Sequence, residues 1–405
     1  MTSNECVLIA GAGPVGMTTG LALATAGIPV KIFDALTEIP TDHRASTLHP
    51  STLMLIEELG MTEKLLKRGI ESPFFQFRDR VSGKIVAEFD YGAISDILKF
   101  PFALQVEQHK TIEVARDLAL KLDTFELFRG KELVNLEQDE HGVKITVQDT
   151  DQTKTDYKGK FLIGADGGKS IVRKFLDIDF PGFTWQERFI IVSTYFDFAA
   201  ADGWRYRNYV AHPEQWCALI KVPGEKDEGV WRALFPAFGD DPDEHVLGDQ
   251  WIQDRFAECY PYDPPYDLLH RNLYSVHQRV ASSFAKGRVA LAGDSAHVNN
   301  PLGGMGMNSG IHDGINLAEK LSRAWNGEDY ASLLSLYDRQ RRPMAEKYVQ
   351  AQSIQNKRLL QETDPEIREK RLNELSETAK NKASHRAYLL RASLVQMMEE
   401  ANAIK

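Results

Sequence analysis

The chain has 405 residues, 43% hydrophobic and 26% charged, which suits one large globular domain or two closely packed ones. Its formal net charge of -10 argues against nucleic acid, which requires a basic surface, and against binding to anionic lipid. An acidic chain can still bind an anionic small molecule through a few local arginines. The composition therefore argues against two classes of partner and says little about the substrate.

The cysteines and the N-terminal residues carry little functional signal. Cys6, Cys217 and Cys259 form no CxxC pair and no metal-ligand spacing, so we expect thiols in a reducing compartment and no metal. The apolar run that begins at Cys6 follows no basic segment and is too short for a signal peptide or a membrane span. We expect a soluble protein of the cytoplasm.

The hydrophobic pattern predicts alternating strands and helices before residue 165, interrupted by sheet-like alternation over residues 73–100. Ser51 is expected to cap the second helix, which Gly60 ends. The predicted strands are residues 7–10, 30–33, two strands within 132–148 and 161–163, and the predicted helices are residues 17–26, 51–59 and 107–122.

A different pattern follows. Residues 180–280 contain alternating aromatic runs broken by Pro and Gly, which suits an antiparallel sheet. Residues 289–292 return to the pattern of a buried strand. The tail from about Asp329 is charged and helical, with Pro343 near a helix start or kink.

The first chemical motif is Gly11-Ala12-Gly13-Pro14-Val15-Gly16, placed between the first strand and the first helix. In GxGxxG the glycines permit a tight turn, a close approach of backbone to a pyrophosphate, and close packing of helix on strand. The helix N-terminus favours phosphate. Asp34, at the end of the second strand, can bind ribose hydroxyls. This motif alone does not separate NAD from FAD.

The second motif is Gly164-Ala165-Asp166-Gly167, which also follows a strand. An ordinary β-turn explains it equally well, because Asp-Gly is common in turns. The continuation Ser170-Ile171-Val172-Arg173 favours a binding role.

The third motif begins with Gly293-Asp294 and continues to the loop Pro301-Leu302-Gly303-Gly304-Met305-Gly306-Met307-Asn308, ahead of a helix predicted from about Ser309 to Trp325. A carboxylate after a strand suits a sugar-alcohol chain. A glycine-rich helix start lets N–H groups approach a flat ligand and stabilise an anionic reduced flavin. The alternative is a helix capped by a glycine turn.

All three motifs, in this order, resemble those of group A flavoprotein monooxygenases, the family of para-hydroxybenzoate hydroxylase, over residues 5 to about 350. The resemblance implies that the first motif holds the ADP part of FAD, that Asp294 binds the ribityl chain, and that Asp166 serves both FAD and the nicotinamide cofactor. It also implies FAD contacts from Arg44, Gln105 and Val134.

One departure from the family pattern concerns residue 305. Many relatives have Gly-Gln-Gly before Leu-Asn or Met-Asn, whereas this chain has Gly304-Met305-Gly306-Met307-Asn308. The contact of residue 305 with flavin or substrate is therefore expected to differ.

The resemblance also implies the reaction. NADH or NADPH reduces FAD, and O₂ forms a flavin C4a-hydroperoxide that attacks an electron-rich ring. The sequence does not choose between NADH and NADPH, and it contains no catalytic triad; His297 is expected to be structural. A phenol or a hydroxylated aromatic or pyridine carboxylate is the first expectation for the substrate, and a polyketide- or quinone-type ring is the alternative.

The substrate is expected between the flavin and the inserted sheet, with the Pro301 carbonyl near the ring hydroxyl. About half of the candidate side chains should point away, because strand side chains alternate. An arginine among them would suit a substrate carboxylate through paired hydrogen bonds. The candidates on the sheet are Tyr195, Arg207, His212, Trp216 and Arg232.

Other functions fit less well. A flavin-dependent halogenase would need a Trp-x-Trp-x-Ile-Pro run, and a plain NAD dehydrogenase would need no Gly-Asp motif. Too few residues follow the last predicted helix for a thioredoxin-like third domain. A non-catalytic carrier on the same fold would be expected to lose the flavin-side residues, which here include Asp294.

The predicted fold is α/β: a Rossmann-like FAD-binding domain built from separated segments, an inserted and mainly antiparallel β-sheet substrate domain, and a C-terminal helical tail. The tail is expected to pack on the body or on a second subunit of a possible homodimer. The predicted boundaries are 1–72, 101–180 and 281–345 for the FAD-binding domain, 73–100 and 181–280 for the substrate domain, and 346–405 for the tail.

Overall fold

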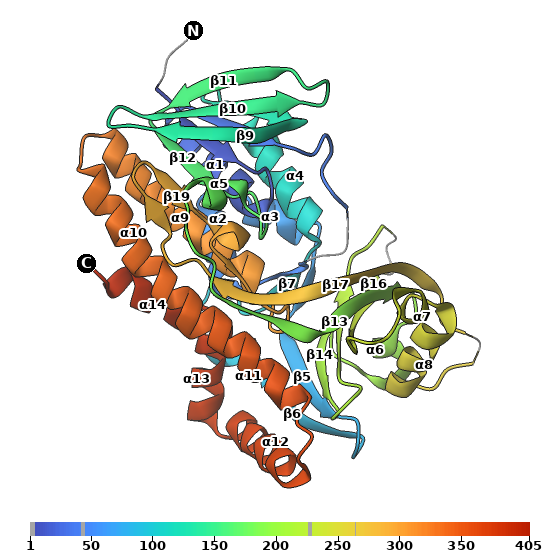
Figure 1. Ribbon diagram of the computed structural model, residues 1–405. Helices are drawn as coiled ribbons and strands as arrows, with labels where there is room; N and C mark the ends of the chain where they lie inside the picture. Colours follow the sequence, from blue (N-terminus) through green and yellow to red (C-terminus); the bar gives the residue numbers. More distant parts are fainter. Residues whose placement is uncertain (1–4, 42–44, 226–228, 264) are drawn as a thin grey trace.

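The computed structural model describes residues 5–41, 45–225, 229–263 and 265–405, and it shows a mixed α/β fold with helices at the C-terminal end (Figure 1). Arg44, expected near FAD, lies outside the described residues. Within the described ranges, every helix is too short or too polar to span a bilayer.

The first layer is a six-stranded sheet. In chain order its strands are β1 (Val7–Ala10), β2 (Val30–Asp34), β8 (Phe125–Arg129), β12 (Phe161–Gly164), β18 (Ala285–Lys286) and β19 (Val289–Leu291). Their spatial order is β18-β19-β12-β1-β2-β8, and all neighbours are parallel except β18 and β19. The predicted strands at residues 7–10, 30–33, 161–163 and 289–292 are therefore confirmed, and strands from distant parts of the chain lie side by side.

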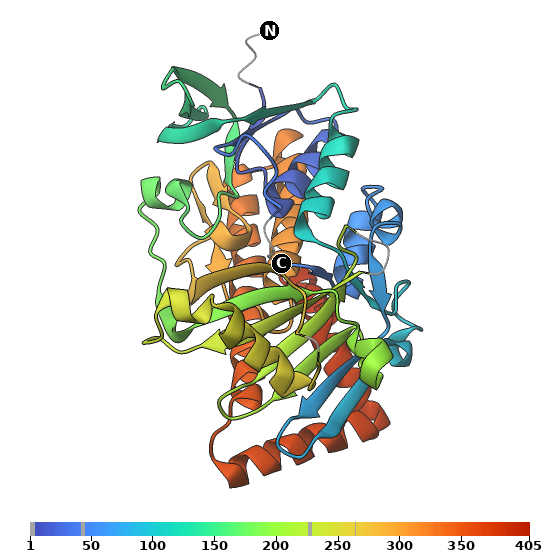
Figure 2. The ribbon, with the colours of Figure 1, turned by 90° about the vertical axis from the view of Figure 1, so that its right-hand side faces the viewer.

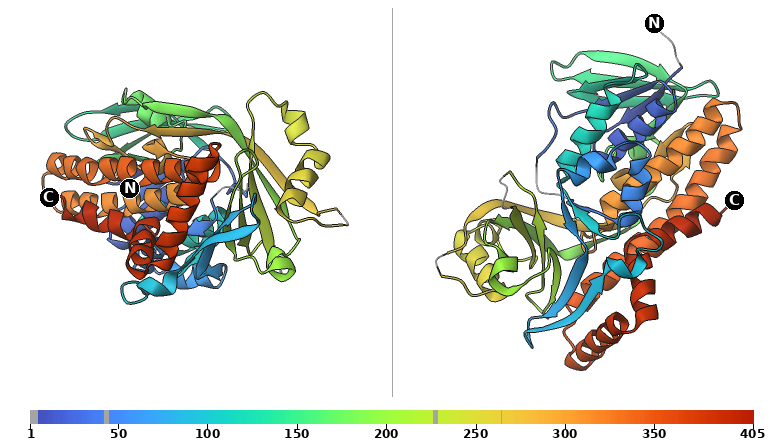
Figure 3. Two further views of the ribbon diagram at one scale, coloured as in Figure 1. Left: turned by 90° about the horizontal axis from the view of Figure 1, so that it is seen from below. Right: turned by 180° about the vertical axis from the view of Figure 1, so that it is seen from behind.

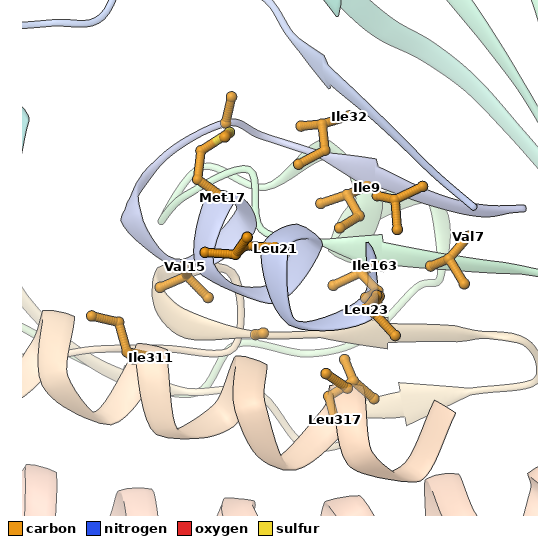
Figure 4. Packing of buried hydrophobic residues seen from close by; sticks show 14 of the residues in the cluster. Val7, Ile9, Val15, Met17, Leu21, Leu23, Ile32, Ile163, Ile311 and Leu317 are labelled. Atoms are coloured by element: carbon orange, nitrogen blue, oxygen red, sulfur yellow. The ribbon is translucent and has the colours of Figure 1, made fainter. Parts of the chain in front are cut away.

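Helices cover one face of this sheet. They include α1 (Pro14–Thr25), α4 (Gln108–Ala119), α9 (Met305–Trp325) and α10 (Tyr330–Met344). Figure 4 shows Ile9 of β1 and Leu21 of α1 meeting Ile311 and Leu317 of α9 in one apolar core. Burial of such side chains is the main stabilising term of the fold.

A three-stranded antiparallel sheet covers the other face, consisting of β9 (Lys131–Gln138), β10 (Val143–Asp149) and β11 (Lys154–Gly159). Phe33 stacks on Phe128, and Tyr157 of β11 packs against both rings. The two strands predicted within residues 132–148 are confirmed. Asp139 shapes their turn by accepting hydrogen bonds from the backbone N–H groups of His141 and Gly142.

The predicted cap of the second helix is wrong. Helix α2 (Pro50–Glu57) begins at Pro50, a residue that favours the first helical position, and His49 is its N-cap. Ser51 lies inside the helix, and its hydroxyl donates instead to the carbonyl of Ser393 (2.6 Å). This tertiary hydrogen bond could not be seen in the local sequence. The nearby elements are β3 (Thr47–Leu48), α3 (Thr62–Leu66), β4 (Ile70–Ser72) and β7 (Ala103–Gln105).

The second large layer is an eight-stranded sheet, seen in Figure 2. Its strands are β5 (Phe74–Asp79), β6 (Lys84–Asp90), β13 (Gly182–Thr194), β14 (Arg207–Ala211), β15 (Cys217–Val222), β16 (Val230–Ala237), β17 (Leu268–Val280) and β20 (His297–Val298). The spatial order is β20-β17-β13-β16-β15-β14-β5-β6, antiparallel except between β14 and β5. The sheet-like alternation over residues 73–100 thus belongs to the same sheet as residues 180–280.

Both faces of this sheet are covered. One face packs against short helices that the sequence analysis did not predict: α6 (Phe198–Asp202), α7 (Asp243–Val246) and α8 (Asp249–Cys259). The other face turns toward the nucleotide-binding motifs and, farther along, toward the tail. A bulge between Phe77 and Arg78 shifts the register of β5 and β6, and Ile85 is 51% exposed while Ala87 and Phe89 are buried.

The tail is helical, as predicted, and packs on the body of the same chain (Figure 3). Its elements are the π-helical turn η3 (Ala345–Gln350), α11 (Ala351–Leu360), α12 (Pro365–Lys380), α13 (Lys382–Ala392) and α14 (Val395–Ala403). Pro343 lies inside α10, just before the π-helical turn, in agreement with the expected irregularity. Leu375 and Leu389 join the core of the eight-stranded sheet.

Candidate functional site

A cavity of about 920 Å³ lies where the three glycine motifs meet the eight-stranded sheet. Its position at the carboxyl ends of parallel strands is the usual one for a ligand in an α/β fold. Thirteen residues predicted for the cofactor or the substrate line it: Gly11, Ala12, Gly13, Pro14, Val15, Asp34, Asp166, Arg232, Asp294, Pro301, Gly304, Gly306 and Met307.

The first motif requires its glycines for contact with the second motif. Gly11 has a φ of +100°, and a Cβ on it would lie 2.3 Å from the carbonyl oxygen of Ala165. A Cβ on Gly13 would instead meet no protein atom within 4 Å, and Gly13 lines the cavity. The N-terminus of α1 carries no side-chain cap, so its N–H groups and the positive end of the helix dipole are available to an anion there.

Asp34 is fixed at the end of β2. Its carboxylate accepts hydrogen bonds from the backbone N–H groups of Ala12 (2.6 Å) and Leu36 (2.8 Å). Each oxygen retains further acceptor capacity, and the residue lines the cavity. The geometry suits a carboxylate held ready for hydroxyl groups of a sugar.

The second motif is tied to its own helix and to the third motif. Asp166 accepts hydrogen bonds from the Ser170 hydroxyl (2.6 Å) and from the backbone N–H of Ile171 (2.7 Å), at the start of α5 (Ile171–Phe175). Burial raises the pKa of this carboxyl group. Arg173 donates to the carbonyls of Ser295 (2.7 Å) and Gly168 (2.8 Å), which joins the two motifs.

The third motif forms the start of α9, which begins at Met305 rather than near Ser309 as expected. Gly304 is the N-cap, with a φ of +66° and no side-chain cap, so the first N–H groups of α9 are left for a ligand. The chain from Gly304 to Met307 lines the cavity. This helix start therefore places a positive dipole end at the centre of the cavity.

Sequence reasoning missed Gly310, which brings α9 against α1. A Cβ on Gly310 would lie 2.7 Å from the Val15 side chain and 2.9 Å from the Gly293 Cα. A Cβ on Gly314 would lie 2.1 Å from the Thr19 hydroxyl. The spacing of four between these glycines was the available signal.

Five predicted cofactor residues do not line the cavity: Gly16, Gln105, Val134, Gly293 and Asn308. Asn308 fastens the glycine loop, because its amide donates to the carbonyls of Thr47 (2.7 Å) and Gly304 (2.6 Å). Gln105 accepts a hydrogen bond from the Thr47 hydroxyl (2.8 Å), while its buried Nε2 has no protein partner. Gly16 and Gly293 support the close packing around α1.

These features fit FAD. The start of α1 can hold phosphates, and the carboxylates of Asp34 and Asp294 line the space where hydroxyl groups would lie. The start of α9 suits the electron-rich edge of a flavin. The open space beside Gly13, which lines the cavity, agrees independently with a bound group at this place.

The sheet supplies the opposite wall of the cavity. The side chains come from neighbouring strands, and their register places them on one face of the sheet. Most are apolar or aromatic, which suits a ring. They are Ile191, Tyr209, Ala218, Ile220, Arg232, Leu234, Asn272 and Tyr274.

Arg232 is the charged member of this wall. Its side chain is buried, with 6% of the residue exposed, and its Nε and Nη1 have no hydrogen-bond partner among the residues that the structure describes. Burial lowers its pKa to about 10, opposed by the nearby charge of Glu107, so the guanidinium is still protonated at neutral pH. A buried cation with unused donors is costly unless an anion meets it.

Arg207 is already satisfied by protein groups. It donates to the Tyr209 hydroxyl (2.8 Å), the Tyr91 hydroxyl (3.1 Å) and the carbonyl of Gly303 (3.0 Å). It lies behind the cavity lining rather than in it. Its contacts hold the glycine loop against the sheet.

The other three candidates on the sheet also lie outside the cavity lining. His212 follows β14 in a turn, and its ring accepts a hydrogen bond from the backbone N–H of Gln215 (2.9 Å). Trp216 packs edge-on against Phe189 (5.1 Å between ring centroids) in the core. Tyr195 follows the last residue of β13.

His297 is part of a buried ion network, and it does not line the cavity. Its Nε2 lies 2.7 Å from Asp313 Oδ2, and Arg341 Nε donates to Asp313 Oδ1 (2.7 Å). Burial opposes the charge of Asp313, but Arg341 and His297 lower its pKa overall. Because Asp313 also accepts from the Gly293 N–H (3.2 Å), the network fixes the turn of the third motif.

Comparison with known proteins agrees with this geometry. Residues 5–352 match the family described as FAD binding domain. Para-nitrophenol 4-monooxygenase of Pseudomonas sp. strain WBC-3 is 28% identical over 393 residues, which cover 96% of each chain. The 6-hydroxy-3-succinoylpyridine 3-monooxygenase HspB of Pseudomonas putida strain S16 is 28% identical, over 90% of this chain and 91% of that protein.

The fold comparison gives the same result. The crystal structure of p-nitrophenol 4-monooxygenase PnpA from Pseudomonas putida DLL-E4 is similar with a TM-score of 0.91 and 27% identity. The match covers 97% of this chain and 98% of that one. The tail is therefore included in the similarity.

Proposed function

The chain belongs to the FAD-binding-domain family of flavoprotein aromatic monooxygenases, and from this we propose that it hydroxylates a small phenol or hydroxypyridine that carries an anionic or strongly polar substituent. The choice of substrate depends on one observation: Arg232 is a buried cation with unused donors in the wall of the cavity. A non-catalytic carrier is set aside, because the relatives are monooxygenases.

When bound, FAD supplies the redox chemistry that transfers one oxygen atom of O₂ to the ring, with NADH or NADPH as the electron donor. The residues of the chain bind FAD and the substrate, orient the ring and exclude water. We assign the phosphates to the start of α1, sugar hydroxyls to Asp34 and Asp294, and the flavin edge to the start of α9. The N–H groups after Gly304 would stabilise negative charge on a group held there.

The substrate ring then lies between the flavin edge and the sheet. Pro301 and Leu302 line one side of this space, and Tyr209 and Tyr274 line the other. The apolar members of the wall exclude water, and Arg232 receives the anionic end through charge-assisted hydrogen bonds. This orientation presents the hydroxylated end of the ring to the Pro301 loop.

The names of the two full-length relatives support this class. Both are named for a hydroxylated ring with a polar substituent, para-nitrophenol in one and 6-hydroxy-3-succinoylpyridine in the other. A polyketide- or quinone-type ring is the alternative substrate class, because 6-methylpretetramide 4-monooxygenase of Streptomyces rimosus is also a relative.

Three further assignments belong to the proposal. We propose FAD-binding segments at 1–72, 101–180 and 281–345, a substrate domain at 73–100 and 181–280, and a tail at 346–405. The grouping of β5 and β6 with β13 to β17 in one sheet supports this division. We also propose a cytoplasmic location and a homodimer. Light scattering of the purified protein tests the dimer.

The function is tested with the purified protein and a panel of rings. We expect bound FAD in the visible spectrum and stimulation of NAD(P)H oxidation by 4-nitrophenol, 4-hydroxybenzoate or a hydroxypyridine carboxylate. Product formed under ¹⁸O₂ should contain one labelled oxygen. Protein that stays colourless in the presence of FAD, or that makes no labelled product from any ring, would contradict the proposal.

A further inference from the structure

The loop between β20 and α9 is held from behind by the tail. On its cavity side it presents Asn299, Pro301 and Leu302. On its other side it meets β17, η3 and α11. The proposed mechanism uses only the cavity side, so the second set of contacts has no assigned role.

Gln278 of β17 is the centre of these contacts. Its side chain is buried, and its Oε1 accepts a hydrogen bond from the backbone N–H of Asn300 (2.9 Å). Its Nε2 donates to the hydroxyl of Ser353 on α11 (2.8 Å). One amide therefore joins the loop to the tail. The Asn300 side chain in turn accepts from the Leu302 N–H (3.1 Å), which fixes the turn around Pro301.

Two more amide side chains reach the loop from the tail. Asn356 of α11 donates to the carbonyl of Leu302 (3.2 Å), and its Oδ1 accepts a hydrogen bond from Gln352 (2.9 Å). Gln350 of η3 donates to the carbonyl of Val298 (2.9 Å). Both ends of the loop are thus bonded to the tail. The fit is close, because a Cβ on Gly303 would lie 2.7 Å from the Asn356 amide nitrogen.

The three polar side chains of the tail that make these contacts share one side of the helix. Gln350, Ser353 and Asn356 are three residues apart, so they lie along one side of the helix. Gln350 is the last residue of the six-residue π-helical turn. Such turns are rare in proteins overall, but those that occur are often found at functional sites. The irregular turn precedes the contacts directly, in keeping with a tail shaped to meet the loop.

We propose that α11 positions the Pro301 loop for the reaction, with Gln278 and Asn356 as positioning residues. The inference rests on the proposed function. A loop held in place keeps the ring where oxygen transfer is faster than loss of peroxide. When the loop is loose, reduction continues but more turnovers end as NAD(P)H + H⁺ + O₂ → NAD(P)⁺ + H₂O₂, without oxygen reaching the ring.

The test uses substitutions that keep the shape of the side chain and replace an amide donor by a carboxylate oxygen. N356D replaces the donor to Leu302 by an oxygen and keeps the acceptor for Gln352, and Q278E removes the donor to Ser353 and keeps the acceptor for Asn300. Q355E is the matched control, because Gln355 is an exposed neighbour on α11 and takes the same change of charge. All proteins are compared with FAD bound, at pH 8 and at a temperature where each is fully folded.

Two measurements are made on each protein. We expect the fraction of NAD(P)H oxidation that yields hydroxylated product to fall at least about twofold in N356D and Q278E, with matching peroxide and an unchanged rate of flavin reduction. We also expect faster hydrogen–deuterium exchange in a peptide containing residues 298–304, and neither change in Q355E. This second readout does not depend on catalysis, so it separates a failure of this inference from a failure of the proposed function.

The inference is overturned if both variants, folded and loaded with FAD, show wild-type hydrogen–deuterium exchange in the loop and a wild-type fraction of NAD(P)H oxidation that yields product. If neither variant folds, S353A is judged by the same two measurements; it removes the hydroxyl that accepts from Gln278 and donates to the Gln350 carbonyl (3.1 Å). Loss of thermal stability with unchanged exchange in the loop and unchanged coupling would show a structural role only, and would also overturn it.

Discussion

Arg207 and Arg232 lie in the same row of the eight-stranded sheet, each paired in register with Ile220 between them, and yet only Arg232 lines the cavity. Arg207 is turned toward Tyr91, Tyr209 and the glycine loop. The two arginines are equivalent in the sequence pattern. The hydrogen bonds of Arg207 place it in the scaffold, and the unused donors of Arg232 support our proposal that it binds the substrate.

Replacement of Arg232 by Met should weaken binding of an anionic substrate. A hydrogen bond to a charged group contributes ~1.5–3 kcal/mol, so KM should rise by about 10- to 150-fold. The rise should be smaller for a neutral phenol of the same size, because that substrate makes no charged contact. Steady-state measurements on matched anionic and neutral rings check this, and equal KM values for wild type and R232M on the anionic ring would refute the assignment.

Replacement of Arg207 by Met should act mainly on stability. The change leaves the buried hydroxyl groups of Tyr91 and Tyr209 without their donor, while the Gly303 carbonyl keeps its contact with His49 Nε2 (2.8 Å). Loss of partners by buried polar groups costs ~1–3 kcal/mol each. Urea denaturation should show the loss, whereas the ratio of KM values for anionic and neutral rings should stay at the wild-type value. A selective rise for anionic rings would instead move Arg207 into the substrate site.

Alanine substitutions in the first motif should separate folding from cofactor binding. G13A adds a methyl group where no protein atom lies within 4 Å, so the protein should fold normally. If FAD occupies that space, overpacking of ~1–3 kcal/mol should weaken FAD binding by about 5- to 150-fold. Titration of the apoprotein with FAD measures this, and full affinity would contradict the placement of FAD.

Gly11 is the companion to that test. Gly11 has a φ of +100°, and an added Cβ would lie 2.3 Å from the Ala165 carbonyl oxygen. The backbone must therefore move in G11A. We expect a loss of folding stability of at least ~1–3 kcal/mol even without FAD. Thermal unfolding of the two apoproteins should therefore distinguish G11A from G13A.

The stability should fall in mild acid because two histidines are buried in the neutral form. Burial, with a nearby arginine in each case, lowers the pKa of His49 and of His312 to about 3. The unfolded chain binds a proton at each histidine below about pH 6.5, and the folded chain does not until about pH 3, so stability is highest above pH 6.5 and decreases below it. The slope is at most ~1.4 kcal/mol per pH unit for each histidine.

His312→Gln should remove one of these two contributions. The Thr52 hydroxyl, which lies 3.1 Å from His312 Nε2, can use the new amide as its partner. Urea unfolding between pH 7 and pH 4.5 should give a shallower loss of stability for the variant than for the wild type. Parallel curves would show that His312 is protonated in the folded protein.

The cofactor side of the site could be predicted from the sequence because each motif is a local chemical pattern. A glycine turn, a following helix and an acidic strand end have the same meaning wherever the chain places them. The start of α9 was set four residues too late, since Gly304 and Gly306 are poor helix formers. The cost of these glycines is offset by close approach to α1 and to the cavity, which only the folded structure shows.

The substrate side was less predictable for a physical reason. Every residue of β16 is buried, because helices cover one face of the sheet and the cavity wall the other. The alternation of polar and apolar residues that identifies an inner face is therefore absent. The sequence could propose Arg207 and Arg232 together, but the choice between them depends on hydrogen bonds with Tyr91 and with the glycine loop.

Met305, which stands where many relatives have Gln, touches two parts of the protein. It lines the cavity, and it packs with Met344, Tyr348 and Met397. Ala401 belongs to the same cluster. Substitutions near the C-terminus can therefore change the shape of the cavity through the Met305 side chain. They do so without replacing any residue that lines the cavity. For directed evolution, α14 therefore contains positions where substitutions can act on the cavity through Met305. Libraries that vary only the residues of the cavity wall would not include them.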